Sequence, residues 1–353
     1  MTRLSNNRRG PGASGGSRSN IRQVAERAGV AISSVSRVLS NHPDVSDAMR
    51  VRVLAAVREL GYQPDLLAQG LRSRITHSIG FVVGDISNPL LAEIVNGAES
   101  TLRDAGYSML LTNSEGDPSM DAEHVGLLDR RRVDGLLLSL ADERHRGTLA
   151  SLTALTIPIV VIDRDLPPRV RASAVLSDHR RGMKAGVGHL LDLGHRRIGF
   201  VAGPAVRPSR ERQAALAAVY DERDLPPTYT VLGHSFDSRH GAEVTREMLD
   251  GPDPPTALII GGNQLLSGVL GELGRRQLAL GRQISLISCD SVPLSELFQP
   301  PIAVVKRDTN EIGCVAASLL LERLVGGPEV RPRDVLLPTE FVPRASCGPA
   351  PSA

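Results

Sequence analysis

Two spacings of apolar residues divide the chain into a short helical part and a longer part that alternates strands with helices. Residues 20–60 place apolar residues three or four positions apart, which predicts helices over 21–28, about 32–39 and 46–60. From Ile79 onward, continuous apolar runs such as IGFVV (79–83), GLLLSL (135–140) and IPIVVID (157–163) are separated by amphipathic segments. Runs of this kind indicate parallel strands that helices cover on both faces.

The ends of the first helices carry recognisable capping residues. Asn20 with Gln23 three positions later forms a predicted capping box, and Gly29 permits the positive φ that ends a helix. Ser46 and Gly61 bound the third helix in the same way. Three helices within about 40 residues, with a tight glycine turn between the first two, are typical of a helix-turn-helix module.

The second helix has an apolar face and an unusual polar face. Val35, Val38 and Leu39 stand at positions i, i+3 and i+4 and are predicted to be buried. The outward face then carries short hydroxyls and one arginine: Ser33, Ser36 and Arg37. Hydroxyls bind phosphate and arginine pairs with guanine, so this face suits the major groove of DNA. An ordinary solvated face is the alternative.

The charge distribution favours the DNA interpretation. Residues 1–74 hold 12 arginines and five acidic residues, whereas the remainder holds 29 basic and 34 acidic residues. A polyanion is therefore expected to contact only the N-terminal part. Residues 1–18 are predicted to be a disordered basic arm because they are rich in Gly, Ser, Asn and Arg.

Residues 63–74 follow a predicted DNA-binding domain over 19–62. Pro64 suits the first turn of a helix, but about eight residues are too few for an isolated helix in water. We expect this hinge segment to become helical only when it pairs with a copy of itself or lies on DNA. A plain linker is the alternative.

The remaining core over 75–344 is predicted to form two α/β lobes, followed by a tail over 345–353. HSIGFVVGD (77–85) and HRRIGFVAGP (195–204) read as the same opening strand used twice. The first lobe is expected to contain 76–176 with 305–330, and the second 178–304 with 331–344.

Polar residues follow the predicted strands of both lobes. They are Asp85, Asn88, Asp163, Arg164, Ser177, Asp178, Asn263 and Asp290. In open α/β folds a ligand binds at the carboxyl ends of the strands, and side chains of these types suit the hydroxyls of a sugar. For each single aspartate, a helix cap or a loop position is an equally good interpretation.

The chain resembles the LacI/GalR (lactose-repressor) family of bacterial transcription regulators. The resemblance is carried by IRQVAERAGVAISSVSRVLS (21–40) with GYQPDLLAQGLRS (61–73), and continues through RRVDGLLLSL (131–140) and ISLISCDSVPLSELFQPPIAVVKRD (284–308). It implies a helix-turn-helix head, a hinge helix and a periplasmic-binding-protein-like core, and it covers nearly the whole chain outside the N-terminal arm and the last few residues.

The resemblance also implies roles for individual residues. Base-reading positions fall on Ile32, Ser33 and Arg37, and phosphate-facing positions on Ser34, Ser36 and Ser46. Leu71 matches the hinge leucine that wedges into the minor groove. Effector contacts fall on Ser209, Arg210, Phe236, Asn263 and Asp290, with Arg210 placed by the motif RER (210–212). Gln264 stands where the family usually has an aspartate.

Composition excludes several other classes. Three widely spaced cysteines without a CxxC motif indicate neither a disulfide framework nor a zinc site, and no cofactor is expected. The N-terminus lacks a secretory apolar region and no apolar run reaches the roughly 18 residues of a membrane span, so a cytoplasmic protein is expected.

The sequence therefore predicts a transcription regulator that acts as a repressor. It would bind a palindromic, double-stranded operator as a homodimer under allosteric control by a small sugar-like effector. A solute-binding protein or a sugar-modifying enzyme on the same two-lobed fold are the alternatives. The DNA-binding head disfavours the first, and the second lacks a P-loop, GxSxG or HExxH motif.

Overall fold

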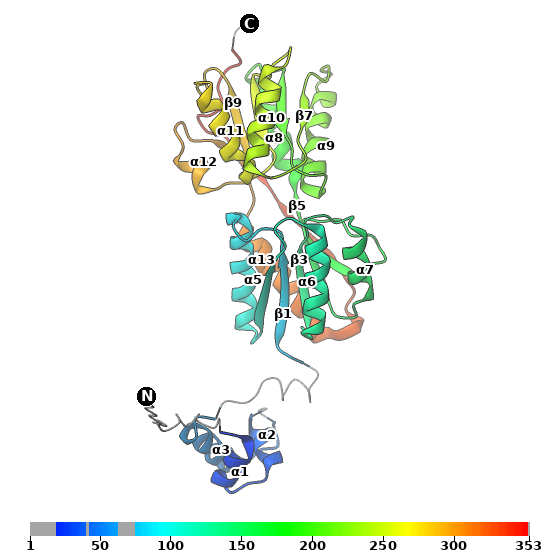
Figure 1. Ribbon diagram of the computed structural model, residues 1–353, viewed down its shortest axis with the longest axis vertical. Coiled ribbons are helices and arrows are strands. Elements are labelled where there is room, and N and C mark those ends of the chain that lie inside the picture. Colours follow the sequence, from blue (N-terminus) through cyan, green and yellow to red (C-terminus); the bar gives the residue numbers. More distant parts are fainter. Residues whose placement is uncertain (1–18, 40–41, 63–74, 352–353) are drawn as a thin grey trace, which may run out of the picture. The chain divides into compact units, whose positions relative to one another are not determined.

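The computed structural model describes residues 19–39, 42–62 and 75–351, which belong to an N-terminal unit ending at Thr76 and a C-terminal unit starting at His77 (Figure 1). The predicted arm over 1–18 and the hinge over 63–74, with Leu71, lie outside the described residues. The N-terminal unit consists of helices α1 (Ile21–Ala28), α2 (Ile32–Leu39) and α3 (Asp47–Glu59).

The predicted capping box at Asn20, the helix end at Gly29 and the apolar faces of this unit are confirmed, whereas Ser46 precedes α3 without a side-chain capping bond. Asn20 Oδ1 accepts from the Gln23 amide at 3.0 Å while Gln23 Oε1 accepts from the Asn20 amide at 2.8 Å, and Gly29 has a φ of 62°. Val24, Val35 and Val53 bring one residue of each helix into a shared core. This core fixes which face of α2 remains at the surface.

The first lobe is built on a six-stranded sheet in the order β11-β5-β4-β3-β1-β2, with all neighbours parallel. Its strands are β1 (Ser78–Val83), β2 (Ser108–Asn113), β3 (Gly135–Ser139), β4 (Ile159–Ile162), β5 (Ala172–Asp178) and β11 (Asp334–Pro338). Helices α5 (Pro89–Asp104) and α13 (Thr309–Gly326) cover one face, and α6 (Pro118–Arg130) and α7 (Arg146–Ala154) cover the other. Phe81 and Val82 lie in the two different cores, as the continuous apolar runs predict.

The second lobe repeats this plan in the order β12-β10-β9-β8-β6-β7, with only β12 antiparallel. Its strands are β6 (Ile198–Val201), β7 (Thr230–Leu232), β8 (Ala257–Ile260), β9 (Ser285–Cys289), β10 (Ala303–Lys306) and β12 (Glu340–Val342). Its helices are α8 (His179–Asp192), α9 (Arg207–Glu222), α10 (Ser238–Asp250), α11 (Asn263–Arg275) and α12 (Pro293–Leu297), and a short 3₁₀ turn (Gly327–Glu329) follows α13 of the first lobe.

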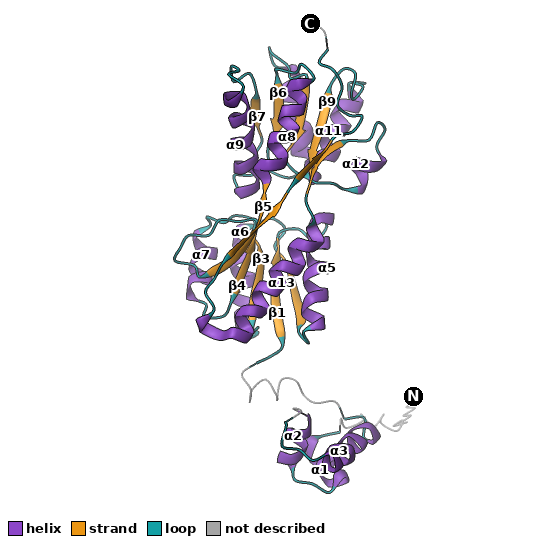
Figure 2. Ribbon diagram, turned by 180° about the vertical axis from the view of Figure 1, so that it is seen from behind, coloured by secondary structure: helices purple, strands orange, loops and turns teal. Residues whose placement is uncertain are grey.

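The chain passes between the lobes between β5 and α8, between β10 and α13, and between β11 and β12 (Figure 2). At the third passage, Thr339 Oγ1 donates to the Asp178 carbonyl at 2.6 Å and accepts from the Gly182 amide at 3.0 Å. The passages therefore lie side by side beside the carboxyl ends of both sheets. They form the hinge of the core, which is distinct from the predicted hinge segment over 63–74.

Two details differ from the sequence-based expectation. The segment 331–344 does not belong wholly to the second lobe, because Asp334–Pro338 pairs with β5 in the first sheet and only Glu340–Val342 joins the second. The run VLLPTEFV reads as one strand, yet it passes from one sheet to the other at Thr339. The amphipathic segment after GLLLSL predicts a helix that begins near Asp142, but α7 begins at Arg146, because Asp142 closes a turn by accepting from the Arg144 amide.

Helices α5 and α13 approach each other at two glycines. A Cβ added at Gly313 would lie 2.0 Å from the Ile94 carbonyl oxygen, and one at Gly97 would lie 2.2 Å from the Asn310 carbonyl oxygen. Both would-be contacts are to backbone, which cannot move away without separating the helices. Glycine at these positions therefore allows α13 to pack against α5 in the first lobe.

We predict that Gly313→Ala lowers the free energy of unfolding of the core by about 1–3 kcal/mol, the usual cost of overpacking. The control is Gly271→Ala in α11, where an added Cβ meets no atom within 4 Å. Alanine there should raise stability by about 0.5–1 kcal/mol through helix propensity. Urea unfolding followed by circular dichroism measures both, and equal shifts in the two variants would refute the close approach.

Candidate functional site

The polar face of α2 lies at the surface of the N-terminal unit. Val35 and Val38 are buried, whereas Ile32, Ser33 and Arg37 are exposed and Ser34 and Ser36 are half-buried. Ile32 is 39% exposed and places an apolar side chain beside the hydroxyls and Arg37 of this face. Ser46 precedes α3 and is exposed, and its side chain makes no capping hydrogen bond.

A cavity of about 670 Å³ lies between the lobes of the C-terminal unit, at the carboxyl ends of both sheets. Six of the predicted ligand residues line it: Asp85, Asn88, Asp163, Phe236, Asn263 and Asp290. Arg164, Arg212, Gln264 and Arg307 line it as well. Most of the predicted ligand side chains therefore lie around one cavity at the strand ends.

Phe236 is held against backbone on one wall of this cavity. A Cβ at Gly203 would lie 2.1 Å from the Phe236 ring, and one at Gly262 would lie 2.8 Å from it. Glycine at both positions lets the ring lie flat against two loops. The ring thereby offers a flat apolar surface to a ligand beside the polar groups of the cavity.

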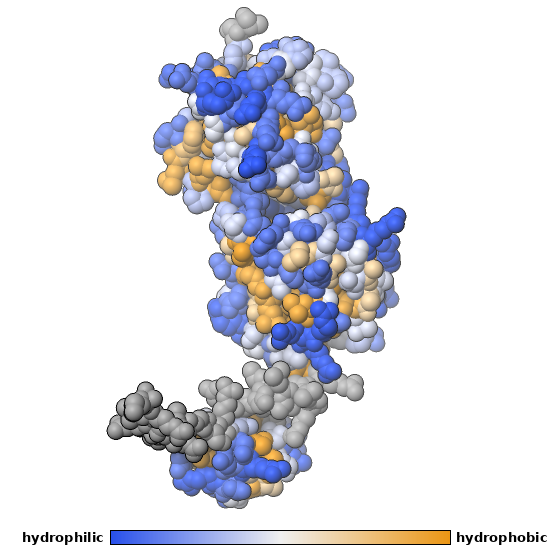
Figure 3. Space-filling view, viewed as in Figure 1, coloured by the Kyte–Doolittle hydropathy of each residue, from blue (hydrophilic) through white to orange (hydrophobic). Residues whose placement is uncertain are grey.

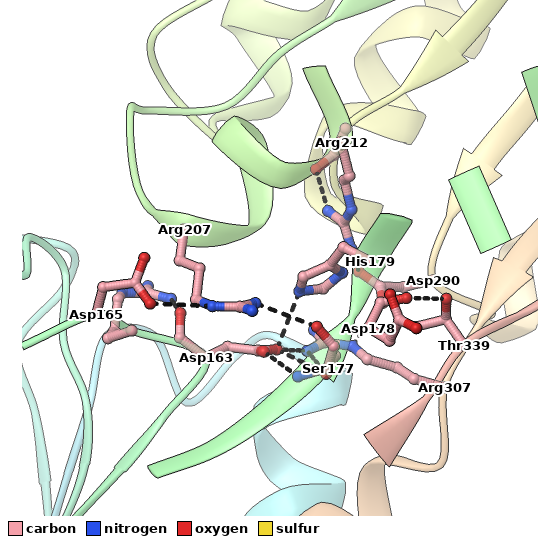
Figure 4. A network of polar contacts seen from close by, with 12 residues as sticks. Asp163, Asp165, Ser177, Asp178, His179, Arg207, Arg212, Asp290, Arg307 and Thr339 are labelled. Atoms are coloured by element: carbon pink, nitrogen blue, oxygen red, sulfur yellow. Dashed lines mark hydrogen bonds and ion pairs between the residues drawn. The ribbon is translucent and has the colours of Figure 1, made fainter. Parts of the chain in front are cut away.

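The floor of the cavity joins two equivalent aspartates through Arg307 (Figure 4). Asp163 follows β4 and Asp290 follows β9, and both have left-handed backbones with φ of 50° and 77°. Asp163 accepts from the Ser177 amide at 2.6 Å and the Ser177 hydroxyl at 2.9 Å. Arg307 donates from Nε to Asp290 at 2.8 Å and from Nη1 to Asp163.

The charges on the floor stabilise one another. Burial acts to raise the pKa of Asp163, but His179 and Arg307 beside it hold that pKa well below its usual value. Burial likewise acts to raise the pKa of Asp290, and Arg307 with Arg212 hold it below its usual value. The two carboxylates are therefore ionised at neutral pH.

The lobes also contact each other beside the cavity through two sets of side chains. In the amide contacts, Gln264 Nε2 donates to Asp85 at 2.6 Å, and Asn263 Nδ2 donates to Asn88 at 3.0 Å. In the ionic contacts, Asp165 of the first lobe binds Arg207 at 3.1 Å and Arg210 at 2.7 Å. Arg210 also binds Glu143 of the first lobe.

Comparisons with known proteins agree with this architecture. A model described as bacterial regulatory proteins, lacI family, matches residues 20–65, and one for a periplasmic binding protein-like domain matches residues 187–347. The chain is 32% identical to the ribose operon repressor of Escherichia coli strain K12 over 309 residues, which cover 86% of this chain and 92% of that protein. It is 30% identical to the repressor PurR of Haemophilus influenzae strain PittEE, over 86% and 90%.

The chain belongs to the lacI family of bacterial regulatory proteins. The Lac repressor dimer bound to operator and an anti-inducer has a similar structure, with a TM-score of 0.81, 26% identity and coverage of 94% of this chain and 99% of that one. A family member from Enterococcus faecium with bound ribose has a TM-score of 0.69 and 26% identity over 77% and 99%.

As a lacI-family regulator, the chain carries a DNA-binding helix-turn-helix in its N-terminal unit and a periplasmic-binding-protein-like core. The named relatives are transcriptional repressors, which are not enzymes. Among the helices within residues 19–62 and 75–351 that could be placed, none has the length and apolar character needed to cross a lipid bilayer.

Three predicted ligand residues do not line the cavity. Asp178 caps α8 by accepting from the Arg181 amide at 3.2 Å, which is the alternative that the sequence left open. Ser209 is buried within α9, and Arg210 makes the ionic contacts described above. The arginine of this helix that reaches the cavity is Arg212.

Helix geometry explains the change from Arg210 to Arg212. Two residues along an α-helix correspond to a rotation of about 200°, so the two arginines of RER point to nearly opposite sides. Arg212 is 3% exposed, donates to the Gly261 carbonyl at 2.7 Å and lies 3.4 Å from Asp290. The motif RER therefore contains the arginine that lines the cavity, at its third position and not its first. Arg307 carried no sequence signal beyond its place in VVKRD.

His179 gives the core a testable pH dependence. Burial lowers its pKa to about 4, against the opposing effect of Asp163 at 3.3 Å. Because the folded pKa lies below the ordinary value near 6.5, folding favours the neutral ring. Stability should be complete above about pH 6.5 and should decline as pH falls towards 4, by at most about 3 kcal/mol from this group.

We predict that His179→Gln flattens the stability profile between about pH 6.5 and pH 4. Urea unfolding of both proteins at several pH values measures the slope. His195 is the internal reference, because its pKa is also lowered by burial and it remains in both proteins. Parallel profiles would mean that folding leaves the pKa of His179 unchanged.

Proposed function

We propose that this regulator is a homodimeric repressor whose operator affinity is set by a small polyhydroxylated effector in the interlobe cavity. The observation that carries the proposal is that residues of both lobes line one cavity beside the hinge. A ligand that touches both lobes stabilises one relative orientation of them. In this proposal the orientation of the lobes decides whether two heads can occupy both operator half-sites.

Exposed apolar side chains supply the proposed dimer surface. Figure 3 shows apolar surface beside β1 of the first lobe and around α12 of the second. Leu110 and Leu111 on the edge strand β2, and Leu294 and Leu297 on α12, are exposed, Leu297 to 77%. An exposed edge strand and an exposed apolar helix are features that a partner subunit covers.

The cavity chemistry supports an effector that is small and rich in oxygen. Its lining combines carboxylates, amides and guanidinium groups with the ring of Phe236 and several aliphatic side chains. Ribose is the first neutral compound to test, since one relative is named as the ribose operon repressor and one similar structure holds ribose. We propose further that the protein releases this effector unchanged.

Fluorescence anisotropy of the full chain on DNA from its own promoter region tests the proposal. Specific binding of a palindromic fragment, with affinity altered by a small molecule, is the expected result. Mass spectrometry of the recovered effector should find the compound intact, because no turnover is expected. Failure to prefer any fragment over random DNA, at one fixed salt concentration, would refute the repressor function.

Arg37→Ala should weaken operator binding by about 1–3 kcal/mol and change binding to random DNA much less. The reason is that Arg37 is exposed on α2 and suits bidentate contact with guanine. Arg58→Ala on α3 removes the same charge and is the matched control, because Arg58 already donates to the Leu54 carbonyl. Equal losses on operator and random DNA would make Arg37 a phosphate contact.

Arg212→Met should lower effector affinity by about 10- to 100-fold, since a buried charged donor would be lost from the cavity wall. Arg210→Met removes an arginine of the same helix that does not line the cavity, and should change effector affinity far less. Titration calorimetry with the effector that shifts operator affinity compares the two. A larger loss in Arg210→Met would restore the assignment made from sequence.

A further inference from the structure

Arg307 places a positive charge in the floor of the cavity, at the second passage of the chain between the lobes. Its side chain is only 12% exposed, yet it lines the cavity. It bonds Asp290 through Nε, and Asp163 and Ser177 through Nη1, with 3.3 Å to the Ser177 hydroxyl. One guanidinium group therefore engages the carboxylates of both lobes at once.

On the floor of the cavity, these bonds occupy acceptor positions that a neutral sugar could otherwise use. Asp163 accepts from Ser177 twice and from Arg307, and His179 lies 3.3 Å away. A carboxylate has about four acceptor positions, so Asp163 has little left to offer. Asp290 accepts from Arg307 and from Arg212.

Asp85, the third predicted carboxylate that lines the cavity, is occupied in the same way. It accepts from the Ser87 amide and hydroxyl at 2.9 and 2.6 Å, and from Gln264 at 2.6 Å. Every hydroxyl of a neutral sugar brings a hydrogen that needs an acceptor. Such a ligand would have to displace these intramolecular bonds.

Donors, in contrast, remain available around the cavity. Arg212 Nε is buried and has no hydrogen-bond partner among the described residues. Arg307 and Arg164 use Nε and Nη1 in hydrogen bonds, and within residues 19–39, 42–62 and 75–351 their Nη2 groups make none. Guanidinium groups stay protonated, and a buried charged donor without a partner is costly.

We infer that the effector carries an oxyanion, a carboxylate or a phosphate, on its polyhydroxylated frame. Arg164, Arg212 and Arg307 bind this group, because an oxyanion accepts several charged N–H donors at once and brings no hydrogen to their side of the cavity. The inference rests on the proposed function and names the chemical class of its effector. The carboxylates on the floor then orient the guanidinium groups and leave the ligand contact to them.

Calorimetry on the full chain tests this with matched sets: D-ribose, D-ribonate and D-ribose 5-phosphate, and D-glucose, D-gluconate and D-glucose 6-phosphate. In at least one set, an anion should bind tenfold or more tightly than its neutral sugar. The comparison of aldonate with phosphate identifies which oxyanion is preferred. Tighter binding of a neutral sugar, or no binding of any of the four anions, overturns the inference.

Arg307 variants provide a second readout. Arg307→Gln should lower anion affinity at least tenfold and raise neutral-sugar affinity, because it frees acceptors on Asp163 and Asp290. Arg307→Lys keeps the charge and should retain the anion preference in part. Arg171→Gln, which changes an exposed arginine of the first lobe outside the cavity, should leave the preference unchanged. Thermal unfolding checks the fold of each variant, and an anion preference that survives in Arg307→Gln would contradict the role of Arg307.

Operator binding separates this inference from the proposed function. If ribose or glucose alters operator affinity where the matched anions do not, the repressor function stands and the oxyanion is wrong. If no DNA fragment is bound specifically, the repressor function fails, and the calorimetry still decides the chemistry of the cavity.

Discussion

The geometry of the core depends on one constraint, which is that the carboxyl ends of two parallel sheets face a shared, poorly solvated space beside the hinge. Polar side chains that follow the strands are then brought together from both lobes, and their charges must be balanced where water is scarce. The Asp163–Arg307–Asp290 bridge meets this requirement with one cation between two anions. The left-handed backbones of both aspartates are held by the hydrogen bonds of their amides to the neighbouring strand, from Asp163 to Val175 and from Asp290 to Val305.

The two lobes use this constraint in equivalent ways. Asp163 follows β4 and Asp290 follows β9. Each of these strands lies next to the strand from which the chain leaves its lobe, which is β5 in the first lobe and β10 in the second. In the first lobe the leaving strand supplies Ser177, and in the second it supplies Arg307. The repeat of the two lobes therefore extends to the floor of the cavity, where one of the two equivalent positions is cationic.

Much of this arrangement could be predicted from local sequence. The capping box at Asn20, the buried face of α2 and the strand-end position of Asp290 follow from short-range spacing alone. The failures concern relations that spacing does not encode. Asp178 and Asn88 both stand near strand ends and both cap helices, but only Asn88 also lines the cavity, a difference that local spacing does not encode. The rotation of α9 about its own axis decides whether Arg210 or Arg212 faces the cavity. One residue more or fewer before a helix is enough to change that rotation.

The segment 334–342 was misassigned for a related reason. An alternating apolar run predicts a strand, but only the tertiary structure shows that the run is cut in two at Thr339 and shared between sheets. Likewise, no pattern marks Arg307 as more than one charged residue after an apolar strand. Its role arises from the two aspartates, 144 and 17 residues away in sequence, that it bonds.

The amide contacts and the ionic contacts that join the lobes beside the cavity should differ in their sensitivity to ionic strength. Dissolved salt weakens the attraction of Arg207 and Arg210 for Asp165, whose side chain is half exposed, but it hardly affects hydrogen bonds donated by the neutral amides of Asn263 and Gln264. As ionic strength rises, the lobes should loosen first where α9 meets the loop after β4, while the amide contacts persist. The lobes should then rotate apart about the amide contacts, which opens the cavity on one side. The positions of the charged loops set the direction of that rotation.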